Sequence, residues 1–445
     1  MRPRTKAWER EEGQHGQTPA LEWCWHPGAR PGTRPPTGFR IHCDHLESTL
    51  VDLKIATFAV DEVVEGTQTG WSDRRLTVSL PQLAVGAGEP ALAEATVEVV
   101  RPGDPVRISN VLDVVLPDVL VGDALLYRLD GVTVVTVCDW VAAGYPEAEE
   151  LPASLIDMAG PASDRSPWGG TANVVVRCIP ARGAAIPEAD AAIRRLAARV
   201  ARELALTTSG REPTHIDAYG PLPQADGSLP GVALILQVAS EGPLVDTFWD
   251  GRPLGVFKPR IIPARNVLAG SLTNGAYDWP GVRNVTAVYQ DNALIRELQS
   301  AHRTTLRFLG VILSPGYLDG ATQKRLAAEA SASLAAELGA DAVVCTTFSS
   351  GNSHTDTMLT VQACERLGIH TVAMVCETNG GLTDHVPEAT SLISTGNEDE
   401  LVEAWTPERI IGGRGLARIG ERVAAVHYVG GLVQTGDARW TAVPA

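Results

Sequence analysis

Small and polar residues run from Phe348 to Asp356, between a predicted strand and a predicted helix. Ligands of parallel α/β sheets bind where loops leave the carboxyl ends of the strands. Loop hydroxyls and the free N–H groups at the start of a helix could hold a carboxylate there. We therefore predict a site for a small carboxylate-bearing ligand, formed by Thr346, Ser350, Asn352, Asp356 and, after the next predicted strand, Glu377. The alternative is that Thr355 or Asp356 only caps the following helix.

Three other side chains of this region could do chemistry. His354 could act as a general acid or base, and the alternative is that it only makes hydrogen bonds in a loop. Cys345 and Cys376 lie near the ends of two predicted strands that should be neighbours or nearly so, and they could form a redox pair. They form no C-x-x-C motif, and free cysteines are often interior residues, so two buried cysteines are the alternative.

The elements that must position these residues alternate regularly in the second half of the chain. Predicted strands cover 232–238, 306–313, 342–347 and 371–376, and predicted helices cover 320–338 and 356–367. The later strands are continuously apolar rather than alternating, which favours a doubly wound, largely parallel sheet.

The first half of the chain is predicted to be β-rich. Strand-like patterns cover 53–55, 76–80, 96–100 and 132–138. A strand over 173–179 and an amphipathic helix over 187–206 then begin an α/β region. The predicted organisation is an extension over 1–48, a β-rich domain over 49–160, an α/β domain over 161–300 and a doubly wound α/β domain over 301–435.

Composition excludes several classes of protein. The 445 residues are 44% hydrophobic and 20% charged, which is typical of globular proteins. A net charge of −16 argues against binding to nucleic acid or to an anionic membrane, and no apolar run approaches the roughly 18 residues of a membrane span. The amino terminus lacks the apolar region of a signal peptide, and the 7 cysteines form no C-x-x-C pair. We therefore expect a cytoplasmic protein with reduced thiols.

Two motif-like patterns do not support a cofactor site. The extension over 1–48 is rich in Pro, Gly, Arg and Glu and is predicted to be mostly disordered. It contains the possible zinc ligands Cys24, His26, His42, Cys43 and His45. Their spacing matches no zinc module, so we predict no metal site. Gly413 and Gly415 are wrongly spaced from Gly420 for a dinucleotide-binding loop, so we predict no nicotinamide site.

Five separated segments of the chain resemble component B of glycine/sarcosine/betaine reductase. They are residues 97–108, 156–161, 272–277, 310–314 and 351–356. Each segment is short, but all five occur in the family's order over roughly residues 50–435. The chain is therefore identified as a relative of this family.

The resemblance implies a subunit that handles a small amine, usually glycine or an N-methylated glycine. In the family, the proprotein cuts itself at a cysteine, and β-elimination leaves a pyruvoyl group on the new amino terminus. This carbonyl condenses with the substrate amine, and a selenolate or thiolate of a second subunit then displaces the amine. The chemistry is covalent catalysis, in which an electrophile activates a poor leaving group. The resemblance thus implies a thiol- or selenol-bearing partner and a hetero-oligomer.

The segment Asn266–Asp278 resembles the family's self-cleavage segment, but it has Tyr277 where the family has its cysteine. The tyrosine hydroxyl lies across a ring and is no leaving group on Cβ, so Tyr277 is predicted to be inactive. Ser271 is the alternative pyruvoyl precursor, because serine can undergo the same acyl shift and elimination. Otherwise Ser271 is a polar turn residue. We predict that the chain stays whole and carries no cofactor unless Ser271 is processed.

Two classes of function are compatible with the sequence. The first is an enzyme subunit that binds a small amine carboxylate for reductive C–N cleavage by a thiol- or selenol-bearing partner subunit. The second is a non-catalytic substrate-binding or scaffold subunit that kept the fold after losing the pyruvoyl group. The sequence does not identify the amine, and it favours neither class strongly.

Overall fold

The computed structural model describes residues 53–83, 89–139, 154–219, 227–240, 245–276, 284–348, 351–378, 388–403, 405–412, 422–433 and 441–443. Over these residues the chain is a mixed α/β protein that is rich in strands and contains several mixed sheets. Residues 50–445 form one compact unit. The extension over 1–48, with its candidate zinc ligands, lies outside the described residues.

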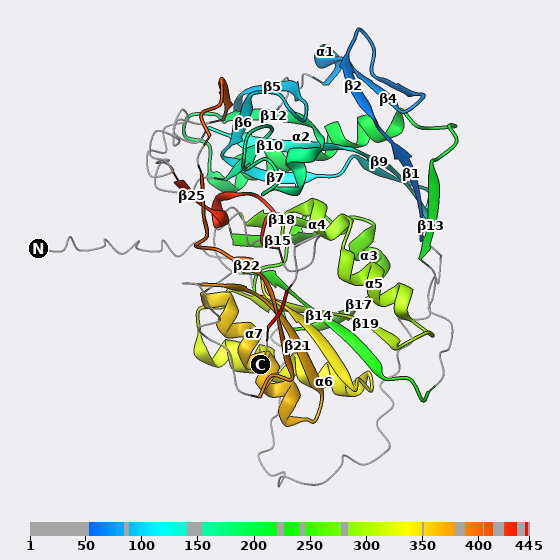
Figure 1. Cartoon of the computed structure of the whole chain (residues 1–445), viewed down its shortest axis with the longest axis vertical. Helices are drawn as coiled ribbons and strands as arrows, with labels where there is room; N and C mark the ends of the chain where they lie inside the picture. The colour runs from blue at the N-terminus through cyan, green and yellow to red at the C-terminus, as the bar shows by residue number, and fades with distance from the viewer. Residues whose placement is uncertain are drawn as a thin grey trace, which may run out of the picture. The chain divides into compact units, whose positions relative to one another are not determined.

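A seven-stranded sheet dominates the second half of the chain (Figure 1). Its strands lie in the order β17 (Arg260–Ile262), β19 (Arg307–Gly316), β14 (Gly231–Ala239), β20 (Ala342–Thr346), β21 (His370–Glu377), β22 (Ser391–Asn397) and β26 (Thr441–Val443). The strands from β19 to β22 are parallel to their neighbours, whereas the edge strands β17 and β26 are antiparallel. The sheet is therefore mixed, and its doubly wound arrangement stays a prediction.

Helices cover both faces of this sheet (Figure 1). On one face, α6 (Ala321–Glu337) and α7 (Asn352–Arg366) pack against alternate residues of β14, with Val361 fully buried. On the other face, α5 (Ala293–Ala301) buries Ile295 against the intervening residues of the same strand. Burial on both faces explains why these strands are continuously apolar in sequence.

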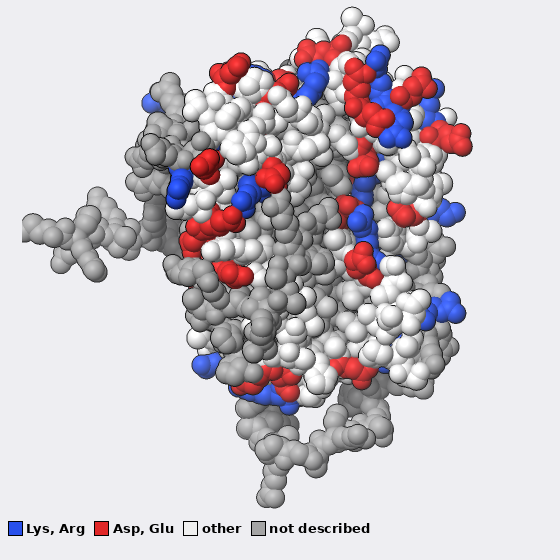
Figure 2. Space-filling view, viewed as in Figure 1, with Lys and Arg blue, Asp and Glu red and all other residues white. Residues whose placement is uncertain are grey.

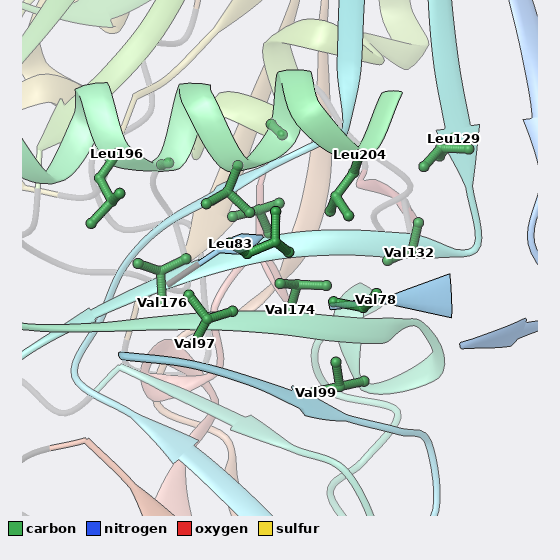
Figure 3. Close-up of a cluster of buried hydrophobic side chains, with 14 of the residues drawn as sticks. Val78, Leu83, Val97, Val99, Leu129, Val132, Val174, Val176, Leu196 and Leu204 are labelled. Carbon is green, nitrogen blue, oxygen red and sulfur yellow. The ribbon is translucent and has the colours of Figure 1, made fainter. Parts of the chain in front are cut away.

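The helix α2 (Ile186–Leu206) covers a second sheet, and its contacts form the main core of the first half (Figure 3). The sheet has the order β5 (Leu92–Val100), β12 (Ala172–Pro180), β10 (Val132–Cys138) and β7 (Val111–Val115). Leu196 and Leu204 project from α2 toward Val174 and Val176 of β12. The central strands β10 and β12 are parallel, and the outer strands are antiparallel to them.

Smaller sheets complete the strand-rich part. One has the order β13 (His215–Tyr219), β1 (Leu53–Ala59), β9 (Leu125–Asp130) and β8 (Asp118–Val121). Another joins β11 (Leu155–Asp157), β6 (Val106–Ser109) and β24 (Arg409–Ile411), and a third joins β2 (Glu62–Glu65), β4 (Arg75–Val78) and β3 (Gly70–Ser72). Strands β23 (Leu401–Glu403) and β25 (Arg422–Ala424) pair with each other, and the short elements are α1 (Leu80–Leu83), η2 (Pro167–Gly170) and η4 (Ala425–His427).

A three-stranded ribbon carries the segment that resembles the family's cleavage site. It has the order β16 (Arg252–Pro253), β15 (Val245–Trp249) and β18 (Leu272–Ala276). The short helices α3 (Ala264–Leu268) and α4 (Thr286–Gln290) flank β18 in the sequence. In β15 and β18, successive side chains point to opposite faces of the ribbon, so each face presents different residues.

Several predicted elements are confirmed, but some boundaries are wrong, since β1 extends to Ala59 and β5 begins at Leu92. The predicted strand over 173–179 and helix over 187–206 agree with β12 and α2 to within a residue at each end. The predicted helix over 356–367 instead begins at Asn352, because Gly351, with a φ of +64°, makes the turn that starts it. The predicted domain boundaries stay untested, although β12 pairs with two strands that precede residue 160.

The surface shows no separation of charge on the face seen in Figure 2. Acidic and basic side chains lie close together there, and no large basic patch of the kind that binds nucleic acid is visible among the described residues. No helix within the described residues is long and apolar enough to cross a membrane.

Candidate functional site

The predicted carboxylate site at the end of β20 is built from side chains that already have partners. The Thr346 hydroxyl accepts a hydrogen bond from the Gln237 backbone N–H at 3.2 Å. The Asn352 side-chain amide donates to the Leu318 carbonyl at 3.2 Å. Ser350 lies outside the described residues. Thr346 therefore joins the neighbouring strands β14 and β20, and Asn352 joins the start of α7 to the loop that follows β19.

Asp356 lies in the first turns of α7 and forms a buried ion pair. Lys324 Nζ of α6 lies 2.8 Å from its carboxylate, and the Leu318 backbone N–H donates to it at 3.2 Å. Burial raises the pKa of Asp356, although the Lys324 ammonium opposes this shift. The prediction that Asp356 or Thr355 caps α7 is wrong, since Gly351 holds the cap position. The Asp356 carboxylate joins α7 to α6, and its charge is already paired with Lys324 rather than available to a ligand.

The remaining predicted residues are spread along the sheet edge. Glu377 ends β21 and accepts a hydrogen bond from the Ser394 hydroxyl of β22. His354 lies within α7 and is buried. Cys345 and Cys376 are both buried free thiols, and burial raises the pKa of each. A raised thiol pKa disfavours the reactive thiolate, so these surroundings do not favour a redox role for the two cysteines.

Two of the segments that resemble component B are joined by a buried ion pair. Arg107 of β6 donates two hydrogen bonds to Asp157 of β11, at 2.5 and 2.8 Å. The Arg107 side chain is 4% exposed and the Asp157 side chain is 0% exposed. The Tyr428 hydroxyl donates to the same carboxylate at 3.3 Å. These segments therefore serve folding by holding three parts of the chain together.

The segment that resembles the cleavage site lies on α3 and β18 as far as it is described. Ser271 precedes β18; its backbone N–H donates to the Asn266 carbonyl at 3.0 Å, and its carbonyl accepts from the Asp250 N–H at 2.8 Å. Tyr277 follows β18 directly and lies outside the described residues. Its predicted inactivity therefore stays a prediction from side-chain chemistry.

A buried chain of hydrogen bonds holds the backbone of β18 in place. The Asn274 backbone N–H donates to the Thr286 hydroxyl at 2.9 Å, and this hydroxyl donates to the Asp113 carboxylate at 2.5 Å. The Thr286 backbone N–H also donates to Asp113, at 2.9 Å. All three residues are buried. The backbone that leads to Tyr277 is thus held against α4 and β7.

A cavity of about 330 Å³ lies beside β18. Its walls come from the first turns of α2, from the β15–β16 hairpin and from Gly275 of β18. Ile186, Asp190 and Arg194 line it at four-residue spacing along one face of α2. The volume is typical of small-molecule sites, and Gly275 is two residues from Tyr277 in the sequence.

Arg194, Phe248 and Gly275 form a stack in this cavity. The Arg194 guanidinium carbon lies 3.1 Å from the centroid of the Phe248 ring, a cation–π contact. The same ring lies against β18, since a Cβ on Gly275 would lie 2.3 Å from Phe248 Cε2. The ring therefore requires glycine at this position. The guanidinium and the strand that leads to Tyr277 thus contact the same aromatic ring.

Two carboxylates flank this guanidinium. Asp190 Oδ2 lies 2.7 Å from Arg194 Nη2, and burial raises the pKa of Asp190 to about 6, although Arg194 opposes the shift. Asp246 accepts hydrogen bonds from the Thr247 and Gly255 N–H groups, at 2.8 and 3.3 Å, and burial raises its pKa as well. Burial lowers the pKa of Arg194, although both carboxylates act to raise it. Perturbed groups in a cavity are typical of functional sites.

Sequence reasoning did not identify this site. Arg194 is one of several arginines of α2, and the helical pattern accounts for it as a surface residue. The available signal is Asp190 at the position four residues earlier, between the apolar residues Ala189 and Ala192. A charged pair inside an apolar helix face indicates a buried polar site.

Comparison with known proteins supports the resemblance that the separated segments suggested. The family model for glycine/sarcosine/betaine reductase component B subunits matches residues 51–425. The chain is 27% identical to the glycine reductase complex component B subunits alpha and beta of Acetoanaerobium sticklandii, over 71% of this chain and 78% of that protein. It is 27% identical to the sarcosine reductase complex component B subunit alpha of Peptoclostridium acidaminophilum, over 72% and 79%.

A third relative is the betaine reductase complex component B subunit alpha of the same organism, 25% identical over 79% of this chain and 85% of that protein. No solved structure matches the chain. The family model covers most of the described fold, including the ribbon with β18 and the Arg107–Asp157 pair. The chain therefore belongs to the family of glycine/sarcosine/betaine reductase component B subunits.

Proposed function

We propose that this chain is a component B-type subunit of an amino-acid-reductase complex, and that it binds a small amine carboxylate in the cavity beside β18. The observation that carries the proposal is the position of Arg194. Its guanidinium contacts the Phe248 ring, which also lies against Gly275 on the strand that leads to Tyr277, and the resemblance assigns Tyr277 to the family's reactive position. The relatives are components of reductase complexes, which supports a hetero-oligomer.

Arg194 is suited to hold the carboxylate of the ligand. A guanidinium has five N–H donors in a planar fork that matches a carboxylate. Asp190 uses Nη2, and Nε is buried without a hydrogen-bond partner among the described residues, so the ligand would bind at the Nη atoms. The Arg194 side chain is 16% exposed, so a small molecule can reach it. Its stacking on Phe248 fixes the plane of the fork before the ligand binds.

The reaction would take place between this ligand and the partner subunit. A thiolate or selenolate of the partner would attack the carbon that carries the amino group. The new S–C or Se–C bond forms as the C–N bond of the ammonium form breaks, and the neutral amine leaves with the bonding electrons and the protons that it already carries. In this account the chain's own residues bind the carboxylate, orient the C–N bond and bury the ligand.

Ser271 is poorly placed to supply a pyruvoyl group to this cavity. It lies at the opposite end of β18 from Gly275, about 13 Å away at the usual rise of a strand. Both of its backbone polar groups are also bonded in the turn that follows α3. The residues present therefore do not fit the group, and we assign no step to it.

We expect the purified polypeptide to stay whole. Cleavage with elimination requires a nucleophile on Cβ that can take the acyl group and then depart, and Tyr277 has none. Intact-mass spectrometry should show one species near 47.2 kDa. Two fragments, the smaller one blocked and beginning at residue 271, would show that Ser271 is processed. Fragments that separate before Tyr277 would show that the argument from elimination chemistry is wrong.

Calorimetric titration tests the binding itself. Glycine and sarcosine should bind to the wild-type protein, and Asn352→Ala should change their affinities by less than about twofold, because the Asn352 amide is used by the Leu318 carbonyl. A tenfold loss in Asn352→Ala would favour the site predicted at the end of β20 over the cavity. Absence of any binding by the intact protein would remove the proposed ligand class.

A further inference from the structure

The cavity beside β18 holds more negative than positive charge. Asp190 comes from α2 and Asp246 from β15, so the two carboxylates reach Arg194 from different elements. They also repel each other, since Asp246 raises the pKa of Asp190. With a ligand carboxylate held by Arg194, three carboxylates would face one guanidinium, which leaves two negative charges uncompensated. Buried charge is costly unless a partner supplies the opposite sign.

We propose that Asp190 and Asp246 form an ammonium subsite that requires N–H donors, so that the cavity takes primary and secondary amine carboxylates and rejects quaternary ones. This inference rests on the proposed function and narrows its substrate class. A zwitterion of this kind carries its ammonium group one carbon from its carboxylate. With the carboxylate on Arg194, the ammonium group lies within reach of the carboxylates that flank the guanidinium.

The number of hydrogen bonds that a carboxylate can accept supports the preference for amines with N–H donors. A carboxylate has about four acceptor positions. Asp246 lines the cavity and accepts hydrogen bonds from only two backbone N–H groups that the structure shows, those of Thr247 and Gly255. A primary or secondary ammonium group can donate to the positions that remain. A trimethylated ammonium group can donate to none, and it would hold the carboxylate oxygens apart by the size of its methyl groups.

The aromatic residue of the cavity cannot replace the hydrogen bonds that a quaternary ammonium group is unable to donate. Proteins recognise quaternary ammonium groups mainly with the exposed faces of aromatic rings. Among the described residues that line the cavity, Phe248 supplies the aromatic ring. Arg194 covers one of its faces at 3.1 Å, and Gly275 lies against the ring as well. The Phe248 residue is only 9% exposed, so little of the ring is left for a second cation.

A methylation series tests the proposal on the full-length protein. Glycine, sarcosine, N,N-dimethylglycine and betaine would be titrated by calorimetry against wild type, Asp246→Asn and Asp250→Asn. In wild type, betaine should bind at least about tenfold more weakly than glycine, with a decline along the series. In Asp246→Asn this preference should fall below about threefold, because the amide has one acceptor oxygen in place of two and accepts weaker hydrogen bonds from the N–H donors of the ligand.

Asp250→Asn is the matched control. Asp250 is an exposed residue of the same hairpin with a φ of +48°, a conformation that asparagine adopts readily. This variant should keep the wild-type preference. Equal affinities of glycine and betaine in wild type would overturn the ammonium subsite while leaving the proposed function in place. Failure of all four ligands to bind wild type would overturn both, and loss of the preference in Asp250→Asn would show that Asp246 is not its source.

Discussion

Replacing Arg194 with glutamine is expected to weaken the binding of glycine or sarcosine by at least about 30-fold. The change removes the charge that pairs with the ligand carboxylate inside a partly buried cavity. Loss of one partner of such a pair costs about 2–5 kcal/mol, and about 2 kcal/mol corresponds to 30-fold in affinity. Arg194→Lys keeps the charge but loses the planar fork, so it should give an intermediate loss. Calorimetric titration measures both effects.

Arg195 offers a matched control on the same helix. Its guanidinium pairs with Glu89 at 2.7 Å, and its side chain is 60% exposed. Arg195→Gln therefore removes the same charge from the same turn of α2, outside the cavity, and should change the affinity by less than about twofold. Similar losses in Arg194→Gln and Arg195→Gln would mean that the cavity does not bind the ligand.

Replacing Asp157 with asparagine is expected to lower the free energy of unfolding by about 3–5 kcal/mol, the usual result of breaking a buried ion pair. The substitution leaves the Arg107 guanidinium buried without its charge partner. It also weakens the hydrogen bond from the Tyr428 hydroxyl, which joins the carboxyl-terminal part of the chain to β11. Urea denaturation followed by circular dichroism measures the difference.

The exposed pair of Glu62 and Arg75 provides the control for this experiment. Their side chains are 51% and 58% exposed, so Glu62→Gln should cost less than about 1 kcal/mol. A cost for Asp157→Asn that is no larger than this would show that the two segments are not held together by the Arg107–Asp157 pair. The resemblance of these segments to component B would then need another physical reason.

The local pattern of apolar residues was sufficient to predict individual helices and strands. Leu196, Val200 and Leu204 recur at helical spacing, and α2 buries them on one face. The β-branched run that became β10 is buried over its whole length. Pattern could not predict that β10 pairs in parallel with β12, because the choice of partner depends on contacts between distant parts of the chain. The start of α7 was misplaced because its first turn is made of polar residues that also occur in loops.

The candidate site was harder to predict than the fold. Asn352 and Asp356 were chosen because their side chains suit a carboxylate ligand, but their partners Leu318 and Lys324 lie about 30 residues earlier in the sequence. The sequence does not show that such partners exist. Arg194 was overlooked for the opposite reason: its role depends on Phe248 and Gly275, which come from a ribbon that approaches α2 only in the folded protein.

A crystal structure of the protein with bound glycine tests the central claim most directly. The account predicts a glycine carboxylate within 2.7–3.2 Å of an Arg194 guanidinium nitrogen, the normal range for a hydrogen bond. The amino group should lie between Asp190 and Asp246. Glycine bound beside Asn352 and Asp356, with the cavity at Arg194 empty, would contradict the account.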